Sequence, residues 1–298
     1  MTHSASIQLR FSQPPSLWRS FFKVLLRRRR HHAPEHALNI RIEASLTGLR
    51  ATPRHLADYL TQCAHPPGST LPLIYPHLLA MPLHMAMLTH KTFPLALMGL
   101  VHVANRITLH TPIPTDATLE LHCRIDGIQP TERGQSFDIH TRVCIEGVTV
   151  WQEQSTFLAA SGRRSRSAAR PPGVQTKINE PLARWAVAAN AGRRYSRISG
   201  DWNPIHVSKM TARLFGYPQA IAHGMWSLAR CAALLQQGPG LPGPAMLEAR
   251  FKRPLLLPGQ VALYATAQPG LATQFRLEIE GNGEPHIEGR IETGPGVE

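Results

Sequence analysis

Residues 195–206 read Tyr-Ser-Arg-Ile-Ser-Gly-Asp-Trp-Asn-Pro-Ile-His, and residues 222–225 read Ala-His-Gly-Met. The first stretch places a carboxylate, Asp201, and an imidazole, His206, five positions apart across a turn that contains proline. Gly224 follows eighteen positions after that histidine. An acid and a base beside a backbone N–H donor are the groups that proton transfer next to a carbonyl requires. These residues therefore form the first candidate site.

The turn at Asn203 determines how these groups are presented. The residue before a proline is pushed out of the helical region, so Asp201 and His206 are expected at a junction between a loop and a helix. A second helix is predicted to begin near Ala222, which puts Gly224 in its first turn. Unsatisfied N–H groups and the helix dipole favour negative charge there, and a glycine lets a ligand approach the backbone closely.

Between these segments the sequence predicts a short helix over residues 206–215. Its apolar residues Val207, Met210 and Leu214 are expected to face inward, and Gly216 is expected to end it at a C-cap position. An aspartate and a histidine at this spacing are, on their own, most often structural. The interpretation as a site therefore depends on the whole pattern.

The whole pattern resembles the MaoC-like (R)-specific enoyl-CoA hydratases and dehydratases. That family shows Tyr-x-x-x-Ser-Gly-Asp-x-Asn-Pro-Ile-His, then a helix of small residues, then Ile-x-His-Gly-Met. The chain matches this pattern at Tyr195, Ser199, Gly200, Asp201, Asn203, Pro204, Ile205, His206, Gly216, Ile221, His223, Gly224 and Met225. Downstream, residues 251–254 and 258–259 resemble the family's Phe-x-x-Pro-x-x-x-Gly strand motif. More loosely, residues 93–106 resemble the first half of double-hotdog members.

The resemblance implies an α+β fold, a tandem double hotdog in which two long helices are each wrapped by an antiparallel sheet. It also implies that Asp201 and His206 bind and activate a water molecule. This water would add to C3 of a trans-2-enoyl thioester while a proton is delivered to C2. The backbone N–H of Gly224 would hold the thioester oxygen as negative charge develops on it.

By the same resemblance, four further residues would bind the substrate or orient the catalytic groups: Ser199, Asn203, His223 and Met225. Neither a metal nor a redox cofactor is implied, because the thioester already acidifies C2 and an N–H donor can stabilise the charge. The expected activity is reversible hydration of 2-enoyl thioesters to (R)-3-hydroxyacyl thioesters in fatty acid metabolism.

The pattern along the chain indicates two similar halves. We interpret residues 1–38 as a basic extension, 39–160 as a non-catalytic hotdog, 161–175 as a basic linker and 176–298 as the catalytic hotdog. The first half lacks the Ser-Gly-Asp-x-Asn-Pro-x-His pattern, so its histidines, among them His84, His90 and His102, are not expected to be equivalents of His206. One active site per chain is therefore expected.

Helices and strands are predicted from periodicity and turn residues. Helices are expected at 76–90, where Pro82 would kink the helix, and at 222–236. Strands are expected at 39–44, 101–109, 119–126, 136–146, 148–158, 246–251, 260–267, 274–280 and 285–293. A hairpin turn is expected at residues 281–284.

The amino-acid composition limits which class of protein this chain can belong to. The chain has 298 residues, of which 43% are hydrophobic and 17% charged, which is typical of a globular protein. Its four cysteines are scattered without metal-ligand spacing and are expected to be free thiols in a reducing cytoplasm. No apolar run reaches the ~18–20 residues that a membrane span needs. A cytoplasmic protein is therefore expected.

The net charge of +13 is concentrated in two segments. Residues 1–50 hold nine Lys or Arg against two Glu, and residues 161–200 hold nine against one. Residues 14–30 show helical spacing of apolar residues and could form a basic amphipathic helix on an anionic membrane, although packing on the protein itself is the favoured interpretation. No nucleic-acid binding is expected, because the arginines at 163–170 lie among Ser, Gly, Ala and Pro, as in a linker.

Several alternatives stay open. Hotdog folds also host thioesterases, and a non-catalytic subunit that binds acyl thioesters is a second alternative. The carrier is either CoA or an acidic acyl-carrier protein, and Arg193, Arg194 and Arg197 could meet either one. A homodimer is compatible with the sequence.

Overall fold

The computed structural model describes residues 6–17, 33–160, 180–236, 241, 243–266 and 272–294. The basic linker 161–175 lies outside the described residues, and so does the predicted amphipathic helix 14–30 from residue 18 onward. Within the described ranges, no helix is long and apolar enough to cross a membrane.

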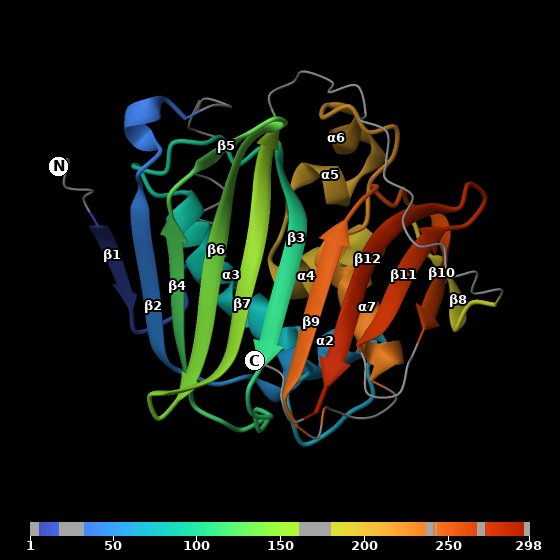
Figure 1. Ribbon diagram of the computed structural model, residues 1–298, viewed down its shortest axis with the longest axis horizontal. Helices are drawn as coiled ribbons and strands as arrows, with labels where there is room; N and C mark the ends of the chain where they lie inside the picture. Colours follow the sequence, from blue (N-terminus) through green and yellow to red (C-terminus); the bar gives the residue numbers. More distant parts are fainter. Residues whose placement is uncertain are drawn as a thin grey trace.

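The described strands form one large sheet (Figure 1). They are β1 (Ser6–Phe11), β2 (Arg41–Leu49), β3 (Leu100–Leu109), β4 (Leu119–Asp126), β5 (Gln129–Thr131), β6 (Gly134–Ile145), β7 (Val148–Ala160), β8 (Ala183–Val187), β9 (Ala245–Phe251), β10 (Gly259–Thr266), β11 (Thr273–Ile279) and β12 (Glu284–Thr293). Their order is β1-β2-β4-β6-β7-β3-β9-β12-β11-β10-β8, with β5 paired to β6. β1 and β2 pair in parallel, and the other named pairs are antiparallel.

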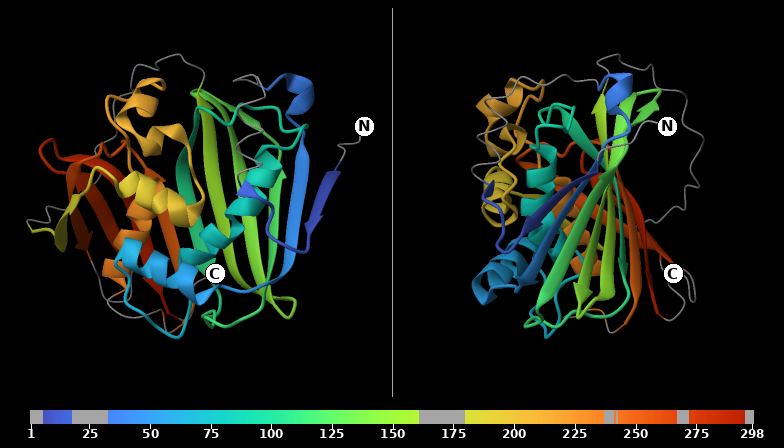
Figure 2. Two further views of the ribbon diagram at one scale, coloured as in Figure 1. Left: turned by 180° about the vertical axis from the view of Figure 1, so that it is seen from behind. Right: turned by 90° about the vertical axis from the view of Figure 1, so that its left-hand side faces the viewer.

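The helices lie on one face of this sheet, and the other face carries none of the described helices (Figure 2). They are α2 (Pro53–Cys63), α3 (Tyr75–Leu88), α4 (Ala191–Ser199), α5 (Pro204–Val207), α6 (Lys209–Arg213) and α7 (Gly224–Leu235), besides the short 3-10 helix η1 (Glu35–Ala37). The apolar side chains of α3 and α7 are buried against the sheet, because one side of each strand is hydrophobic.

The two halves share one sheet and one core. β3 and β9 pair from Ala104 with Arg250 to Leu109 with Ala245, which joins the first half to the second. On the helical side, the indole of Trp226 in α7 donates to the carbonyl of Gln62 in α2 at 2.9 Å. Each half therefore contributes one long helix and a strand set, which confirms the tandem hotdog. All four cysteines are free and buried.

Most predicted elements are confirmed with small shifts of their ends. The strand predicted at 119–126 coincides with β4, and the helix predicted at 222–236 corresponds to α7. The predicted helix at 76–90 corresponds to α3, which contains Pro82 in its interior. The sequence reasoning missed β1, β5, β8, α2, α4 and the short helix η1.

The predicted helix over 206–215 is wrong in its continuity and in its inward face. Ser208 has extended backbone angles (φ −154, ψ 160), so α5 ends before it and α6 begins after it. The Ser208 hydroxyl caps α6 by accepting the N–H of Thr211 at 3.2 Å. Because this break resets the helical phase, Met210 and Leu214 are each 81% exposed instead of buried.

Candidate active site

The loop after α4 is shaped by short-range hydrogen bonds. α4 ends at Gly200, whose φ of 73 lies in the left-handed region that glycine adopts without strain. The Ser199 hydroxyl donates to the carbonyl of Tyr195 at 3.0 Å and accepts the N–H of Asp201 at 3.2 Å. Ser199 therefore fixes where the chain leaves the helix and where Asp201 begins.

Two further local bonds connect Asp201 to α5. The Asp201 carboxylate accepts the N–H of Asn203 through Oδ1 at 3.0 Å, and the Asn203 side chain accepts the N–H of Ile205 at 3.4 Å. Asn203 is the N-cap of α5, and Pro204 occupies its first turn, where no N–H partner is needed. The motif is thus a series of turns and caps that leaves Oδ2 of Asp201 free for other partners.

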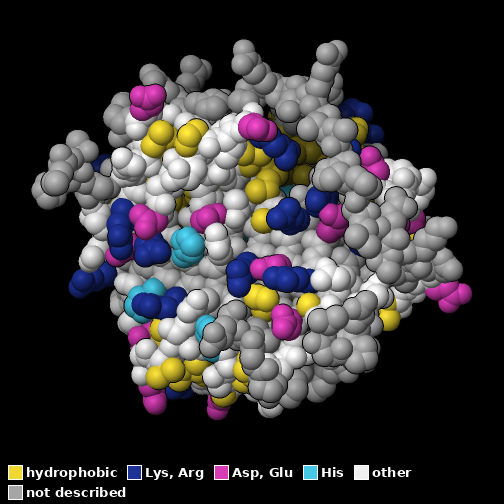
Figure 3. Space-filling model, in the orientation of Figure 1, with side chains coloured by type: hydrophobic (Ala, Val, Ile, Leu, Met, Phe, Trp, Pro, Cys, Tyr) yellow, Lys and Arg dark blue, Asp and Glu magenta, His cyan; other side chains and the backbone are white. Residues whose placement is uncertain are grey.

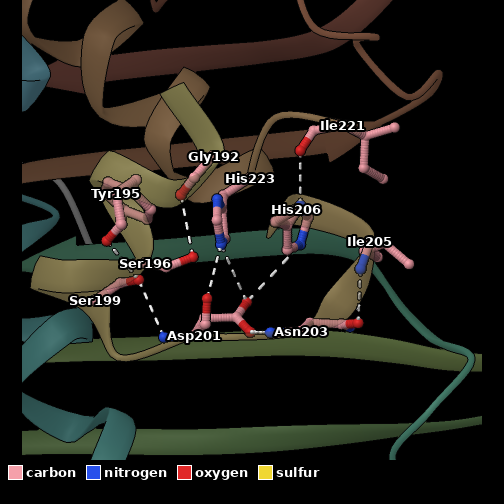
Figure 4. A network of polar contacts seen from close by, with 10 residues as sticks. All are labelled: Gly192, Tyr195, Ser196, Ser199, Asp201, Asn203, Ile205, His206, Ile221 and His223. Atoms are coloured by element: carbon pink, nitrogen blue, oxygen red, sulfur yellow. Dashed lines mark hydrogen bonds and ion pairs between the residues drawn. The ribbon is translucent and has the colours of Figure 1, made fainter. Parts of the chain in front are cut away.

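His206 faces Asp201 from α5 (Figure 4). Its Nδ1 lies 2.8 Å from the carbonyl oxygen of Ile221, so Nδ1 must carry the hydrogen. The neutral ring therefore presents the lone pair of Nε2, which lies 3.9 Å from Oδ2 of Asp201. Ile221 in turn donates its N–H to the carbonyl of Ile205 at 3.0 Å, which ties the segment before α7 to α5.

His223 completes the cluster from the other side. Its Nε2 donates to the carbonyl oxygen of Asp201 at 3.1 Å and lies 3.8 Å from Oδ2 of the same residue. The rings of His223 and His206 are stacked with centroids 3.7 Å apart at 26° (Figure 4). The three predicted residues Asp201, His206 and His223 are therefore brought together in space.

The protonation of this cluster follows from its burial. Burial acts to raise the pKa of Asp201, but His223, His206 and the N–H of Asn203 outweigh it, so this pKa lies below its ordinary value. Burial lowers the pKa of His206, against the opposing effect of Asp201. Burial and the neighbouring His206 lower the pKa of His223 to about 3. At neutral pH the site holds one carboxylate and two neutral imidazoles.

A metal ion does not fit this arrangement well. The three groups offer ligand atoms within 4.8 Å of one another. However, Nε2 of His223 lies 3.1 Å from the carbonyl oxygen of Asp201 and must carry a hydrogen to bond it, and a nitrogen that carries a hydrogen has no lone pair to offer a metal. The geometry suits hydrogen bonding to a small polar molecule.

Gly224 is the first residue of α7 and His223 is its N-cap, so the helix predicted to begin near Ala222 starts two residues later. The first N–H groups of a helix have no partner inside it and favour negative charge. A side chain at this position would meet the ring of Phe251, since an added Cβ would lie 2.7 Å from its Cδ1. Met225, the next residue, is buried in the hydrophobic core.

The first half contributes residues that sequence reasoning missed. His55 of α2 contacts the carbonyl of Ile198 in α4 at 2.7 Å and so supports the helix that carries Asp201. Green strands of this half pass beneath the loop in Figure 4. No local pattern could identify these contacts, because their partners lie about a hundred residues or more away in sequence.

A groove of about 940 Å³ lies on the opposite face of the sheet. It is lined by polar and basic side chains, among them Arg41, Arg106, Arg124 and Arg142. Neither Asp201, His206 nor Gly224 lines it, so it is not part of the candidate site.

Comparisons with known proteins identify the family of this chain. The MaoC like domain family matches residues 174–277. The 3-hydroxyacyl-thioester dehydratase X of Mycobacterium tuberculosis is 32% identical over 237 residues, which cover 79% of this chain and 83% of that protein. The chain belongs to the MaoC-like dehydratase family. The peroxisomal enoyl-CoA hydratase 2 of Arabidopsis thaliana is 27% identical to this MaoC-like chain over 144 residues, 43% of this chain and 46% of that protein.

Solved structures place the MaoC-like chain among double hotdog proteins. HtdX of Mycobacterium tuberculosis superposes with a TM-score of 0.75 at 28% identity, covering 85% of this chain and 100% of the other. Another protein of that organism, with a double hotdog fold, superposes with a TM-score of 0.50 at 10% identity, covering 82% and 92%. This second similarity supports the fold alone.

Proposed function

We propose that this chain is a hydro-lyase that interconverts 2-enoyl thioesters and (R)-3-hydroxyacyl thioesters in fatty acid metabolism. The proposal rests on the pair Asp201 and His206. Oδ2 of Asp201 lies 3.9 Å from Nε2 of His206, close to the first turn of α7. The names of the relatives, a 3-hydroxyacyl-thioester dehydratase and an enoyl-CoA hydratase, support the same chemistry.

The gap between the two groups suits one water molecule. A separation of 3.9 Å is too long for a direct hydrogen bond, but a water beside both atoms can donate one hydrogen to each. Nε2 of His206 is the base, because its other nitrogen donates to Ile221. The Asp201 carboxylate orients the water and stabilises the imidazolium that forms.

Hydration adds the water oxygen to C3 and a proton to C2 in two steps. The water oxygen bonds to C3 and its proton passes to Nε2 of His206, while the electrons of the C2–C3 double bond move toward the thioester oxygen. The N–H of Gly224 stabilises the negative charge on that oxygen. The imidazolium next returns its proton to C2, so the net change is the addition of one water. Dehydration is the reverse sequence.

We also propose that the two halves of the chain have different roles. We assign the reaction to residues 176–298 and a non-catalytic role to 39–160, with 1–38 as an extension and 161–175 as a linker. All three of Asp201, His206 and Gly224 lie in the second half, and α2 of the first half supports α4. The remaining predicted residues would act indirectly, Ser199 and Asn203 through the loop and Met225 through the core.

The carrier is proposed to bind near α4. Arg193, Arg194 and Arg197 are exposed on this helix, which leads directly to Asp201. Arginines suit both the phosphates of CoA and the acidic surface of an acyl-carrier protein. Steady-state rates for the same acyl group on each carrier will distinguish the two. A variant that lacks the positive charges of these three arginines should show a raised KM for the carrier that is used.

The proposal is tested with the purified chain and a trans-2-enoyl-CoA. We expect enoyl absorbance to fall while no free thiol is released. Thiol release in step with substrate loss would instead identify a thioesterase. Binding of the thioester without any change in absorbance would identify a non-catalytic subunit.

The pH dependence of hydration should follow His206. The reaction needs its neutral imidazole, and burial lowers its pKa below the ordinary 6.5, so kcat/KM should be constant from about pH 7 upward and fall only below pH 6.5. Asp201, with its lowered pKa, stays ionised throughout this range. The measurement is kcat/KM for hydration between pH 4.5 and 8. If kcat/KM falls to half its plateau value while the pH is still above 6.5, this assignment is contradicted.

Gly224→Ala should impair catalysis through the ring behind it. An added Cβ would lie 2.7 Å from Cδ1 of Phe251, so either this ring or the start of α7 must shift. Displacement of the N–H donor should lower kcat by about 10²-fold. The double variant G224A/F251L, measured beside F251L alone, should recover most of this loss. If it does not recover, the clash is not the cause.

A further inference from the structure

β12 contains a bulge at His286. Where β11 and β12 pair, Leu277 lies opposite Ile287, but the next residue, Glu278, lies opposite Pro285. His286 is therefore an extra residue of β12 that has no partner on β11. A bulge of this kind changes the direction in which a side chain points, and bulges are frequent beside active sites.

Regular alternation along β12 would turn His286 to the same face as Glu288 and Arg290. The side chains of these two residues are 31% and 43% exposed and form ion pairs with Lys252 and Glu248. Figure 3 shows this face of the sheet, where Lys, Arg, Asp and Glu side chains gather over the strands. His286 is only 3% exposed, so the bulge has moved its side chain from the charged face to the side of the helices.

The buried ring of His286 forms two hydrogen bonds. Nδ1 lies 2.6 Å from the carbonyl oxygen of Arg253, so Nδ1 must carry the hydrogen. Burial lowers the pKa of His286 to about 4, so the ring is neutral near pH 7 and Nε2 keeps its lone pair. Nε2 therefore accepts the hydroxyl hydrogen of Ser227 at 2.9 Å. These two bonds form a buried bridge from β12 to α7 and to the segment after β9.

Both ends of the buried bridge border the start of α7. Ser227 lies in the first turn of α7, which begins at Gly224, and its N–H donates to the carbonyl of His223 at 3.2 Å. At the other end, Arg253 follows two residues after Phe251, the ring that packs against Gly224. The bridge thus ties together the helix turn and the strand end that enclose the proposed oxyanion donor.

A backbone donor stabilises a developing charge only while its direction is fixed, and a displacement of about 1 Å can cost 10²-fold in rate. Given the proposed function, on which this inference rests, we propose that His286 is a positioning residue, which fixes the first turn of α7 through Ser227 and so directs the N–H of Gly224 at the thioester oxygen. Because the charge on this oxygen grows in the transition state, loss of the bridge should lower kcat more than it changes KM.

Hydration kinetics and melting temperatures of Ser227→Ala, His286→Leu and the double variant S227A/H286L test this role. Each single variant leaves one buried polar group without its partner, so its melting temperature should fall. The double variant lacks both the hydroxyl and Nε2, so it should recover part of the melting temperature. In all three we expect kcat to fall by about 10-fold to 10²-fold and KM to change less than about threefold. His286→Gln can accept the Ser227 hydroxyl through its amide oxygen and should restore part of kcat.

The matched control is a second buried bond between a histidine and a hydroxyl. Nε2 of His84 lies 2.7 Å from the Thr141 hydroxyl in the first half, and both residues are buried. His84→Leu should lower the melting temperature and leave kcat unchanged. Recovery of kcat together with the melting temperature in S227A/H286L would overturn the proposal and leave His286 with a packing role. An equal loss of kcat in H84L would overturn it as well.

Hydrogen exchange gives a measurement that does not require turnover. In H286L the amides of residues 225–228 should exchange about fivefold faster than in the unmodified chain, since the first turn of α7 has lost its anchor. In H84L they should exchange at the unmodified rate. Unchanged exchange in H286L would overturn the role of His286, whether or not the chain turns over substrate. Absence of enoyl-thioester hydration by the unmodified chain would refute the proposed function alone.

Discussion

Replacing Asp201 by Asn is expected to lower kcat/KM for hydration of an enoyl thioester by about 10²–10⁴-fold. The variant removes the charge that orients the water and stabilises the imidazolium of His206, whose Nε2 lies 3.9 Å from Oδ2. The fold should survive, because the amide oxygen of asparagine can still accept the N–H of Asn203 as Oδ1 does at 3.0 Å.

The measurement compares kcat/KM and melting temperature of D201N with those of the unmodified chain. Asp138→Asn is the matched control, because Asp138 lies on β6 and accepts hydrogen bonds from Gln154 and Thr156 away from the site. It should keep its full rate. Unchanged turnover in D201N would refute the assignment of the site, even if the chain proves to be a hydratase.

Glu153→Gln is expected to lower the free energy of unfolding by about 1–3 kcal/mol, because it removes a buried carboxylate that is hydrogen-bonded to His77 and Asn105. Glu153 is 3% exposed in β7 and faces Nδ1 of His77 at 2.8 Å. It also accepts from the side chain of Asn105 at 2.7 Å. These contacts are buried, so water cannot replace the lost hydrogen bonds.

The contact between Glu153 and His77 also makes the stability of the fold depend on pH. Burial acts to raise the pKa of Glu153, but the adjacent His77 outweighs it and lowers the pKa from 4.5 to about 2. A depressed carboxyl pKa stabilises the fold above about pH 4.5, and this contribution is lost as the pH falls toward 2. Urea unfolding at pH 7 and pH 4 measures both effects in E153Q and in the unmodified chain.

Glu120→Gln serves as the matched control for this prediction. Its carboxylate is 35% exposed on β4 and lies 4.0 Å from His122. Exposed pairs of this kind contribute about 0–1 kcal/mol, so E120Q should unfold much like the unmodified chain. Equal unfolding midpoints for E153Q and E120Q would show that the buried pair adds nothing to stability.

Much of the site could be predicted because its bonds are local. Ser199, Asp201 and Asn203 each bond a backbone group within four residues, so the turn and the start of α5 follow from short-range chemistry. The start of α7 was predicted near Ala222 and lies at Gly224, although no side-chain hydrogen bond caps this helix. Strands such as β4 followed from strict alternation of buried and exposed residues.

The missed elements lack these patterns. α4 buries Gly192, Tyr195, Ser196 and Ser199, so its inward face carries small and polar residues instead of an apolar stripe. In α2 only Tyr59 and Cys63 are buried. The inward face predicted for Met210 was wrong because one serine, Ser208, interrupts the helix and changes its phase.

The sequence alone determined the family resemblance, the positions of Asp201, His206 and Gly224 and the single motif per chain, because these depend on residues close together. Only the tertiary structure decided that His223 stacks on His206, that Phe251 packs against Gly224 and that His102 of the first half lies beside them. The pairing of β3 with β9 places His102 beside Phe251. Contacts across more than a hundred residues arise from packing of the whole sheet and leave no periodic trace in the chain.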